Sequence, residues 1–162
     1  MFNLLNINLK GFIKLGFVLV VLFAFIACNK TDKEAEQLEV DKKLISDYVT
    51  QKSLIGQFTD SGLWYQVINQ GGGVQAYKTA TVNVIYSGYL LNGTPFDESP
   101  TTGSTFSLNS VIEGWTEGIP KLKEGGNGKL IIPSKLGYGT KVVGDIPENS
   151  VLIFDVELLD VL

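Results

Sequence analysis

The chain of 162 residues carries 17 acidic residues against 13 lysines, with no arginine, and its formal net charge is −4. At roughly 100–200 residues per domain, this length accommodates one folded domain with short extensions. The acidic balance argues against nucleic-acid binding, because phosphate backbones are bound by clustered cationic side chains. Histidine is absent, which excludes Ser-His-Asp and Cys-His catalysis and histidine ligation of metals.

Residues 1–27 are predicted to be a secretory signal. Lys10 and Lys14 precede an apolar run from Leu15 to Ala27. A positive segment, an apolar stretch of about 7–15 residues and a small residue at the end are typical of such signals. The run is shorter than the stretch of about 20 residues that a helix needs to span a bilayer.

The end of this run, Phe-Ile-Ala-Cys at 25–28, resembles the lipobox of bacterial lipoproteins. Cys28 is the one cysteine of the chain and therefore has no internal disulfide partner. The alternative is an ordinary signal peptide, or a single membrane anchor, with an incidental cysteine. We predict a lipid on Cys28 that anchors the protein to a membrane of the cell envelope, at the outer membrane or the periplasmic face rather than in the cytoplasm.

Residues 28–56 are expected to form a polar tether followed by an amphipathic helix from Glu34 to about Gln51. Apolar residues recur there at helical spacing, at positions 38, 44, 45, 48 and 49. Because this stripe is short, the pattern favours a cap packed on the domain, and hence a monomer, over a dimerisation helix. A fragment that begins near Gln57 is accordingly expected to fold and to retain most activity.

From residue 57 onward, turn residues separate short β-rich runs. Sixteen of the 18 glycines and all five prolines lie beyond position 55, which is typical of an antiparallel sheet with turns. The predicted strands are Leu63 to Ile68, Thr81 to Leu91, Thr105 to Leu108, Gly128 to Ile132 and Val151 to Leu159.

Alternating apolar residues indicate that one face of this sheet is buried. Val82, Val84 and Tyr86 alternate with other residues, as do the apolar residues at 152, 154, 156 and 158. One short helix is predicted from Val111 to Ile119, where Gly114 and Gly118 allow a close approach to the sheet. A single helix on a five-stranded antiparallel sheet is an α+β roll.

Several blocks of the chain form a recognisable pattern. They are Val-Asn-Val-Ile-Tyr-Ser-Gly-Tyr-Leu at 82–90, Asn-Gly-Thr-Pro-Phe-Asp-Glu-Ser at 92–99, Val-Ile-Glu-Gly-Trp-Thr-Glu-Gly at 111–118, Ile-Pro at 132–133 and again at 146–147, Leu-Gly-Tyr-Gly at 136–139, and Leu-Ile-Phe-Asp-Val-Glu-Leu-Leu at 152–159. In order, spacing and residue type they resemble the FKBP domain over roughly Gly62 to Leu162. No single block is specific, but the set is.

The resemblance implies a half-barrel antiparallel β-sheet wrapped around a short α-helix, an α+β fold, over residues 57–162. It implies peptidyl-prolyl cis-trans isomerase activity on X-Pro bonds, here of extracytoplasmic proteins, with no cofactor and no metal. The expected partners are proline-containing polypeptides, and macrolide immunosuppressants are possible ligands of the same pocket.

The resemblance also assigns roles to residues of this chain. It gives the catalytic roles to Asp97, Tyr138, Phe96, Trp115 and Phe154, and substrate binding to Tyr86, Phe106, Val111, Ile112 and Ile146. Trp115 is expected to form the floor under the proline ring. The N–H of Ile112 and the hydroxyl of Tyr138 are expected to bind substrate carbonyls, with Asp97 as an acceptor at the rim.

The chain departs from the family pattern at two places. Thr102 lies near the position of the arginine that usually pairs with the rim aspartate, which leaves Asp97 without that cation. The loop from Thr140 to Asp145 is slightly short. A binding module that grips proline segments without turnover, and a structural lipoprotein subunit of an envelope machine for motility or secretion, are the alternatives to an isomerase.

Overall fold

The computed structural model describes residues 32–162, so the predicted signal and Cys28 lie outside the described residues. Residues 32–51 are helical, which confirms the helix expected there. The remaining elements are β1 (Gln57–Phe58), β2 (Trp64–Asn69), β3 (Thr81–Leu90), β4 (Pro95–Glu98), β5 (Ser104–Ser107), α2 (Glu113–Gly118), η1 (Ile119–Lys121), β6 (Gly126–Ile132), η2 (Ser134–Leu136) and β7 (Leu152–Val161). Within the described part of the chain, no helix is long and apolar enough to cross a membrane.

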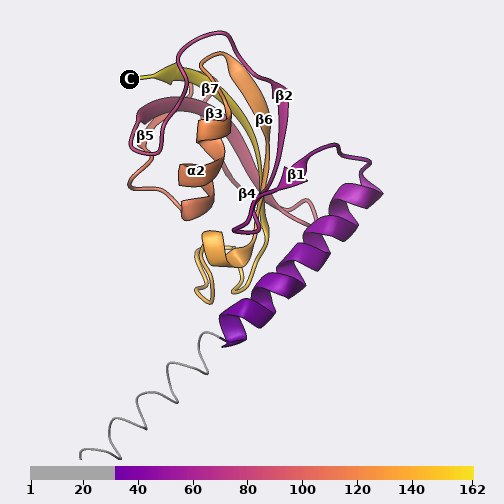
Figure 1. Ribbon diagram of the computed structural model, residues 1–162. Helices are drawn as coiled ribbons and strands as arrows, with labels where there is room; N and C mark the ends of the chain where they lie inside the picture. Colours follow the sequence, from indigo (N-terminus) through magenta and orange to yellow (C-terminus); the bar gives the residue numbers. More distant parts are fainter. Residues whose placement is uncertain (1–31) are drawn as a thin grey trace, which may run out of the picture. The chain divides into compact units, whose positions relative to one another are not determined.

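The strands form one antiparallel sheet in the order β1-β2-β6-β7-β3-β4. Strand β3 pairs with β7 along one edge and with both β5 and β4 along the other. Helix α2 lies on one face of the curved sheet (Figure 1). The expected α+β fold, an antiparallel sheet wrapped around a short helix, is therefore confirmed.

The face that α2 covers holds the main hydrophobic core. The alternation predicted from the sequence is confirmed, because Val82 and Val84 of β3 are fully buried there with Leu152 and Leu158 of β7. A Cβ on Gly114 would lie 2.5 Å from Ile132 and one on Gly118 would lie 2.7 Å from Leu130. Glycine at these two positions thus lets α2 pack directly on β6, as expected.

The opposite face of the sheet is also partly buried, which the alternation did not predict. Ile131 of β6 and Ile153 of β7 are cross-strand neighbours on this face, and both are 0% exposed. They form a second cluster with Trp64 of β2 and Ile45 of the helix over residues 32–51. The helix therefore covers apolar sheet surface, and the expectation that it packs on the domain is confirmed.

Two of the strands were not expected from the sequence. Strand β1 has two residues, and β4 begins at Pro95, a residue type that cannot donate to a ladder and is confined to strand edges. The predicted helix is also shorter than expected. It ends at Gly118, and the chain continues as the 3-10 turn η1, which holds Pro120 in its first turn.

We predict that Ile45→Ala lowers the free energy of unfolding by about 2–5 kcal/mol, because it leaves a cavity in the second cluster. Leu44 is 43% exposed on the same helix, so Leu44→Ala is a matched control that should change stability by about 0.5 kcal/mol or less. Urea unfolding of both variants measures the difference. Equal effects would show that the helix does not pack on the sheet through Ile45.

Candidate functional site

Five aromatic rings form a continuous cluster between α2 and the sheet. Trp115 of α2 contacts Tyr86, Phe106 and Phe154 edge-on, with centroid distances of 5.0, 5.4 and 5.3 Å. Phe96 joins through Phe154 at 5.5 Å. Such T-shaped pairs each contribute about 0.5–1.5 kcal/mol beyond the burial of their area. The rings come from β3, β4, β5, α2 and β7, so the whole fold holds them in place.

The cluster combines two buried rings with three partly exposed ones. Trp115 and Phe154 are each 4% exposed. Tyr86, Phe96 and Phe106 are only partly buried and pack against the same core. We call these five rings the aromatic cup, with Trp115 as its floor and the other rings as its walls, and such apolar rings suit a proline side chain better than a charged group.

Gly88 makes the contact between two of the rings possible. It pairs with Phe154 across β3 and β7. A Cβ at this position would lie 2.7 Å from Phe96 and 2.8 Å from Phe154, too close for any side chain. The glycine of the block at 82–90 therefore lets Phe96 cross over β3 to reach Phe154.

Asp97 is held at the rim by a phenol rather than by a cation. The hydroxyl of Tyr86 donates a hydrogen bond of 2.9 Å to Oδ2 of Asp97. No ion pair between described residues includes Asp97, so its partner is a neutral donor on the neighbouring strand. The orientation of Asp97, which the sequence left open, is thereby fixed.

The burial of the ring and the hydrogen bond to Asp97 raise the pKa of the Tyr86 hydroxyl. Burial, the hydrogen bond to Asp97, the charge of Asp97 and the nearby Tyr138, in decreasing order of effect, together raise the pKa of Tyr86 to about 12. Tyr86 is therefore neutral at physiological pH and serves as a hydrogen-bond donor. It is not suited to act as a base.

Tyr138 and Ile146 come from the segment that follows η2. Both pack against the same core cluster as the rings. Val143 and Ile146 exchange backbone hydrogen bonds of 3.0 and 2.9 Å, which closes the loop between them. At the tip of this loop, Val142 is 71% exposed and Val143 is 38% exposed.

Val111 and Ile112 complete the set just before α2, and both pack against the core cluster. Neither the N–H of Ile112 nor the hydroxyl of Tyr138 has a hydrogen-bond partner among residues 32–162. Both donors are thus available to carbonyl groups of a bound chain. Of the ten residues predicted for the site, the five rings contact one another and Asp97 is joined to them through Tyr86, while Val111, Ile112, Tyr138 and Ile146 belong to or pack against the same core cluster.

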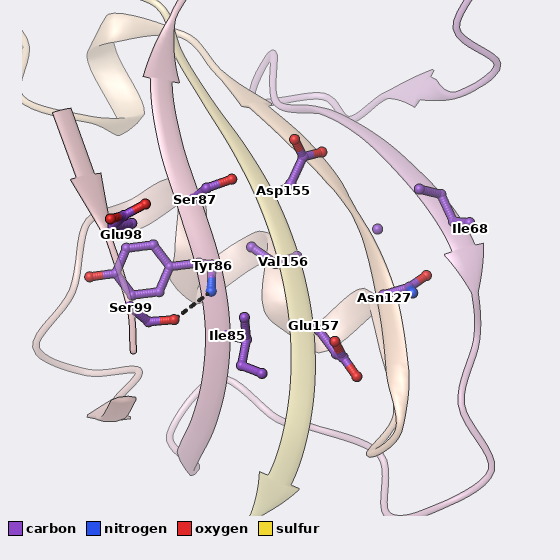
Figure 2. Close-up of a pocket in the computed structure, with 11 residues that line it drawn as sticks. Ile68, Ile85, Tyr86, Ser87, Glu98, Ser99, Asn127, Asp155, Val156 and Glu157 are labelled. Atoms are coloured by element: carbon purple, nitrogen blue, oxygen red, sulfur yellow. Dashed lines mark hydrogen bonds between the residues drawn. The ribbon is translucent and has the colours of Figure 1, made fainter. Parts of the chain in front are cut away.

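A hollow of about 400 Å³ lies on the sheet beside Tyr86, and Figure 2 shows the residues that line it. Its lining mixes the apolar side chains of Ile68, Ile85 and Val156 with Glu98, Asp155 and Glu157. The N–H of Tyr86 donates to Oγ of Ser99 there at 3.0 Å. Tyr86 is the one aromatic residue in this lining, and we assign the candidate site to the aromatic cup, where five rings meet.

The sequence did not predict the roles of Gly88 and of the Tyr86 to Asp97 hydrogen bond. Both depend on strand register, since Gly88 pairs with Asp97 between β3 and β4. The block at 82–90 already contained both Tyr86 and Gly88. No signal in the sequence alone distinguishes the neighbours that these residues meet across the sheet.

Comparisons with known proteins agree with this geometry. Residues 72–159 match the family model of the FKBP-type peptidyl-prolyl cis-trans isomerases. The isomerase FkpA of Escherichia coli K12 is 44% identical over 135 residues, which cover 82% of this chain and 48% of that protein. A probable FKBP-type isomerase of Haemophilus influenzae is 48% identical over 142 residues, which cover 84% of this chain and 58% of that protein.

Solved structures show the same likeness. The crystal structure of FkpA from Escherichia coli superposes with a TM-score of 0.66 at 38% identity and covers 89% of this chain and 71% of that one. A peptidyl-prolyl isomerase from Pseudomonas syringae gives a TM-score of 0.68 at 29% identity, covering 78% of this chain and 93% of that one. The chain spans about half the length of the curated FkpA relatives that it matches, 57% and 48% for two of them.

We predict that the phenol of Tyr86 titrates at about pH 12 in the folded protein, against about 10 in the unfolded chain. Since the folded pKa is the higher one, the stabilisation contributed by the neutral phenol is complete below about pH 10 and is lost as pH rises toward 12. The difference in unfolding free energy between the parent and Tyr86→Phe should therefore be constant up to pH 10 and shrink above it.

Ultraviolet titration at alkaline pH measures the ionisation directly, and the parent-minus-Tyr86→Phe difference isolates this tyrosine. The subtraction is needed because burial and Asp155 also raise the pKa of Tyr89. Asp97→Asn should lower the pKa of Tyr86 only partway, because burial is the largest cause. A difference titration centred at the ordinary tyrosine pKa would contradict the assignment.

Proposed function

The chain belongs to the family of FKBP-type peptidyl-prolyl cis-trans isomerases, because residues 72–159 match the model of that family, and we propose that it isomerises X-Pro bonds in other polypeptides as a folding helper. The observation that carries the proposal is the aromatic cup around Trp115, together with the N–H of Ile112 and the hydroxyl of Tyr138, two donors that pack against the same core and have no partner among residues 32–162. The catalytic domain is proposed to span residues 57–162, after a signal over 1–27 and a tether with helix over 28–56.

The reaction needs neither a nucleophile nor a proton acceptor. Rotation about an amide is slow because resonance must be lost, at a barrier of about 18–20 kcal/mol. X-Pro bonds therefore isomerise in tens to hundreds of seconds. No covalent bond is broken, so a chain without histidine is at no disadvantage for this chemistry.

In the proposed mechanism, the proline ring rests on Trp115 with Phe96, Phe154 and Tyr86 as walls. The planar amide is more polar than the twisted one, because the nitrogen recovers its lone pair during rotation. An apolar enclosure therefore disfavours the ground state more than the transition state. The enclosure thus acts differently on the ground state and the transition state, and only interactions that favour the transition state over the ground state accelerate a reaction.

Hydrogen bonds to the neighbouring carbonyls are proposed to hold the chain while the bond rotates. The donors are the N–H of Ile112 and the hydroxyl of Tyr138, and Asp97 accepts from Tyr86 at the rim. At about 1.36 kcal/mol per tenfold rate, lowering the barrier by about 5.5 kcal/mol gives roughly ten-thousand-fold acceleration.

The clients are proposed to be exported proteins, since the sequence predicts a signal over residues 1–27 and a lipid on Cys28. The finding that supports this setting is the likeness to isomerases named FkpA. We further propose that the protein acts as a monomer, because the short helical stripe packs on its own domain through Ile45. Macrolide ligands of the family are proposed to occupy the same cup.

We predict that the parent protein accelerates isomerisation of a Pro-containing test peptide and that Tyr138→Phe lowers kcat/KM, because its hydroxyl no longer donates to a substrate carbonyl. Asp97→Ala is expected to lower kcat/KM only a few-fold, since its contact is to Tyr86 rather than to substrate. Both side chains are at the rim, so stability should change by less than about 1 kcal/mol. A protease-coupled assay and thermal unfolding measure the two quantities.

Phe154→Ala serves as the contrasting variant, since it removes a buried wall of the cup and should also cost about 3–5 kcal/mol of stability. Full turnover in both rim variants would show that the site residues are wrongly assigned. A parent that binds proline peptides but never turns them over would favour a binding module. A parent that does neither would favour a structural envelope subunit.

We predict that Cys28→Ser abolishes membrane attachment and leaves the fold intact, because the cysteine serves only as the acylation site. Acyl chains contribute about 0.8 kcal/mol for each buried CH₂, so several chains on one residue hold a protein firmly. Membrane fractionation and palmitate labelling decide the question. Unchanged retention of the serine variant in the membrane fraction would refute lipid anchoring.

A further inference from the structure

A carboxylate outside the aromatic cup is buried as completely as any core residue. Asp41, on the helix over residues 32–51, is 0% exposed. Its Oδ2 accepts hydrogen bonds from the N–H and the hydroxyl of Ser134, at 2.7 and 2.6 Å, and its Oδ1 accepts one from Nε2 of Gln37 at 2.8 Å. A buried charge is retained only where its lone pairs are satisfied, and here three donors satisfy them.

Ser134 connects this carboxylate to the segment that carries Tyr138. Ser134 is 1% exposed and begins η2. Its carbonyl accepts hydrogen bonds from the N–H groups of Gly137 and Gly139, at 3.0 and 2.8 Å. These two residues flank Tyr138 on either side, so the position of Ser134 sets the position of the Tyr138 backbone.

A further hydrogen bond joins Gly139 to Asn149, which lies later in the chain. The carbonyl of Gly139 accepts a 2.7 Å hydrogen bond from the N–H of Asn149. Gly139 has a φ of +59° and Gly137 has a φ of −109° with a ψ of −116°. Glycine adopts such conformations freely, so the segment around Tyr138 has little rigidity of its own and depends on the hydrogen bonds at Ser134.

We propose that Asp41 is a positioning residue of the isomerase site, which holds Ser134 by both of its donors and thereby fixes the Tyr138 hydroxyl over the cup. This inference rests on the proposed function of the cup. Two donors of one residue on a single carboxylate oxygen restrain both the backbone and the side chain of Ser134. The geometry thus makes Asp41, on the helix over residues 32–51, a supporting part of the site.

This assignment revises the expectation that a fragment beginning near Gln57 retains most activity. Such a fragment lacks Asp41, so the Ser134 N–H and hydroxyl lose their acceptor. It also lacks Ile45, which exposes the apolar face around Ile131 and Ile153. The fragment should therefore lose activity through the first contact and stability through the second.

The test compares kcat/KM of the full-length protein, Asp41→Ala, Tyr138→Phe and the double variant, at a temperature where circular dichroism shows all four folded. Small displacements of groups that orient a substrate have large rate effects, and we expect Asp41→Ala to lower kcat/KM about tenfold in the parent. In the Tyr138→Phe background, where no hydroxyl remains to be positioned, the same change should lower it less than about twofold.

Two further variants separate positioning from general stability. Asp41→Asn keeps an oxygen that accepts from both Ser134 donors, so it should restore most of the activity lost in Asp41→Ala. Ile45→Ala is the matched control on the same helix, because it destabilises the protein without touching Ser134. Its kcat/KM should equal that of the parent when both are folded.

Hydrogen exchange of the amides of Gly137 and Gly139 gives a readout that does not depend on turnover. Asp41→Ala should speed exchange at both amides, and Ile45→Ala should do so only in step with global stability. Unchanged exchange at these amides in Asp41→Ala would overturn the proposal. An equal loss of kcat/KM from Asp41→Ala in both backgrounds, or from Ile45→Ala, would overturn it as well.

If the parent shows no turnover, the proposed isomerase function fails, and the exchange data alone then decide whether Asp41 holds the Tyr138 segment. If Asp41→Ala does not fold, Ser134→Ala replaces it in the comparison. Ser134→Ala removes one of the two donors and should lower kcat/KM about threefold in the parent and not in the Tyr138→Phe background. Full activity of Ser134→Ala would then overturn the proposal.

Discussion

The packing of one six-residue helix against a long curved sheet is the constraint on which the rest of the structure depends. Gly114 and Gly118 bring α2 onto Ile132 and Leu130 of β6. At this distance Trp115 reaches Tyr86, Phe106 and Phe154, which come from three different strands. Because the helix is too short to cover the whole face, the remaining apolar surface is formed by these rings.

Because α2 leaves part of the sheet face uncovered, the hydrophobic core and the candidate site share residues. Trp115, the floor of the cup, and Phe154, one of its walls, are almost fully buried, whereas the other walls are partly open. Substitutions of the floor therefore change stability and activity together. The groups at the rim, such as Asp97 and Tyr138, contribute contacts without filling the core, and so they are better probes of chemistry.

Sequence patterns predicted the central strands because alternation is a local property, whereas the site residues were predicted from the family resemblance. Alternating apolar residues mark β3 and β7, and the blocks between 82 and 159 contain four of the five rings of the cup, all but Phe106. The partner of Asp97 could not be predicted, since Tyr86 reaches it across the paired strands β3 and β4. Strand β4 was missed because a four-residue run that begins with proline carries no alternation.

The sequence predicted that the helix over residues 32–51 packs on the sheet, but it did not predict that Asp41 of this helix is buried. Its apolar stripe indicated a packed face, and Ile45 lies in the second cluster as expected. Asp41 lies among charged residues in the sequence and resembles part of a solvated surface. Its burial follows from the contact with Ser134, which is 93 residues away, and no local pattern reports a contact of that separation.

The central claim is that the aromatic cup lowers the barrier to rotation of an X-Pro bond. Exchange NMR on a proline-containing peptide, with the protein at a small fraction of the peptide concentration, measures this rotation directly at equilibrium. We expect cross-peaks between the cis and trans forms that appear with the parent protein and weaken in Tyr138→Phe. A parent protein that shifts the peptide resonances by binding, yet leaves cis–trans exchange as slow as in buffer, would contradict it.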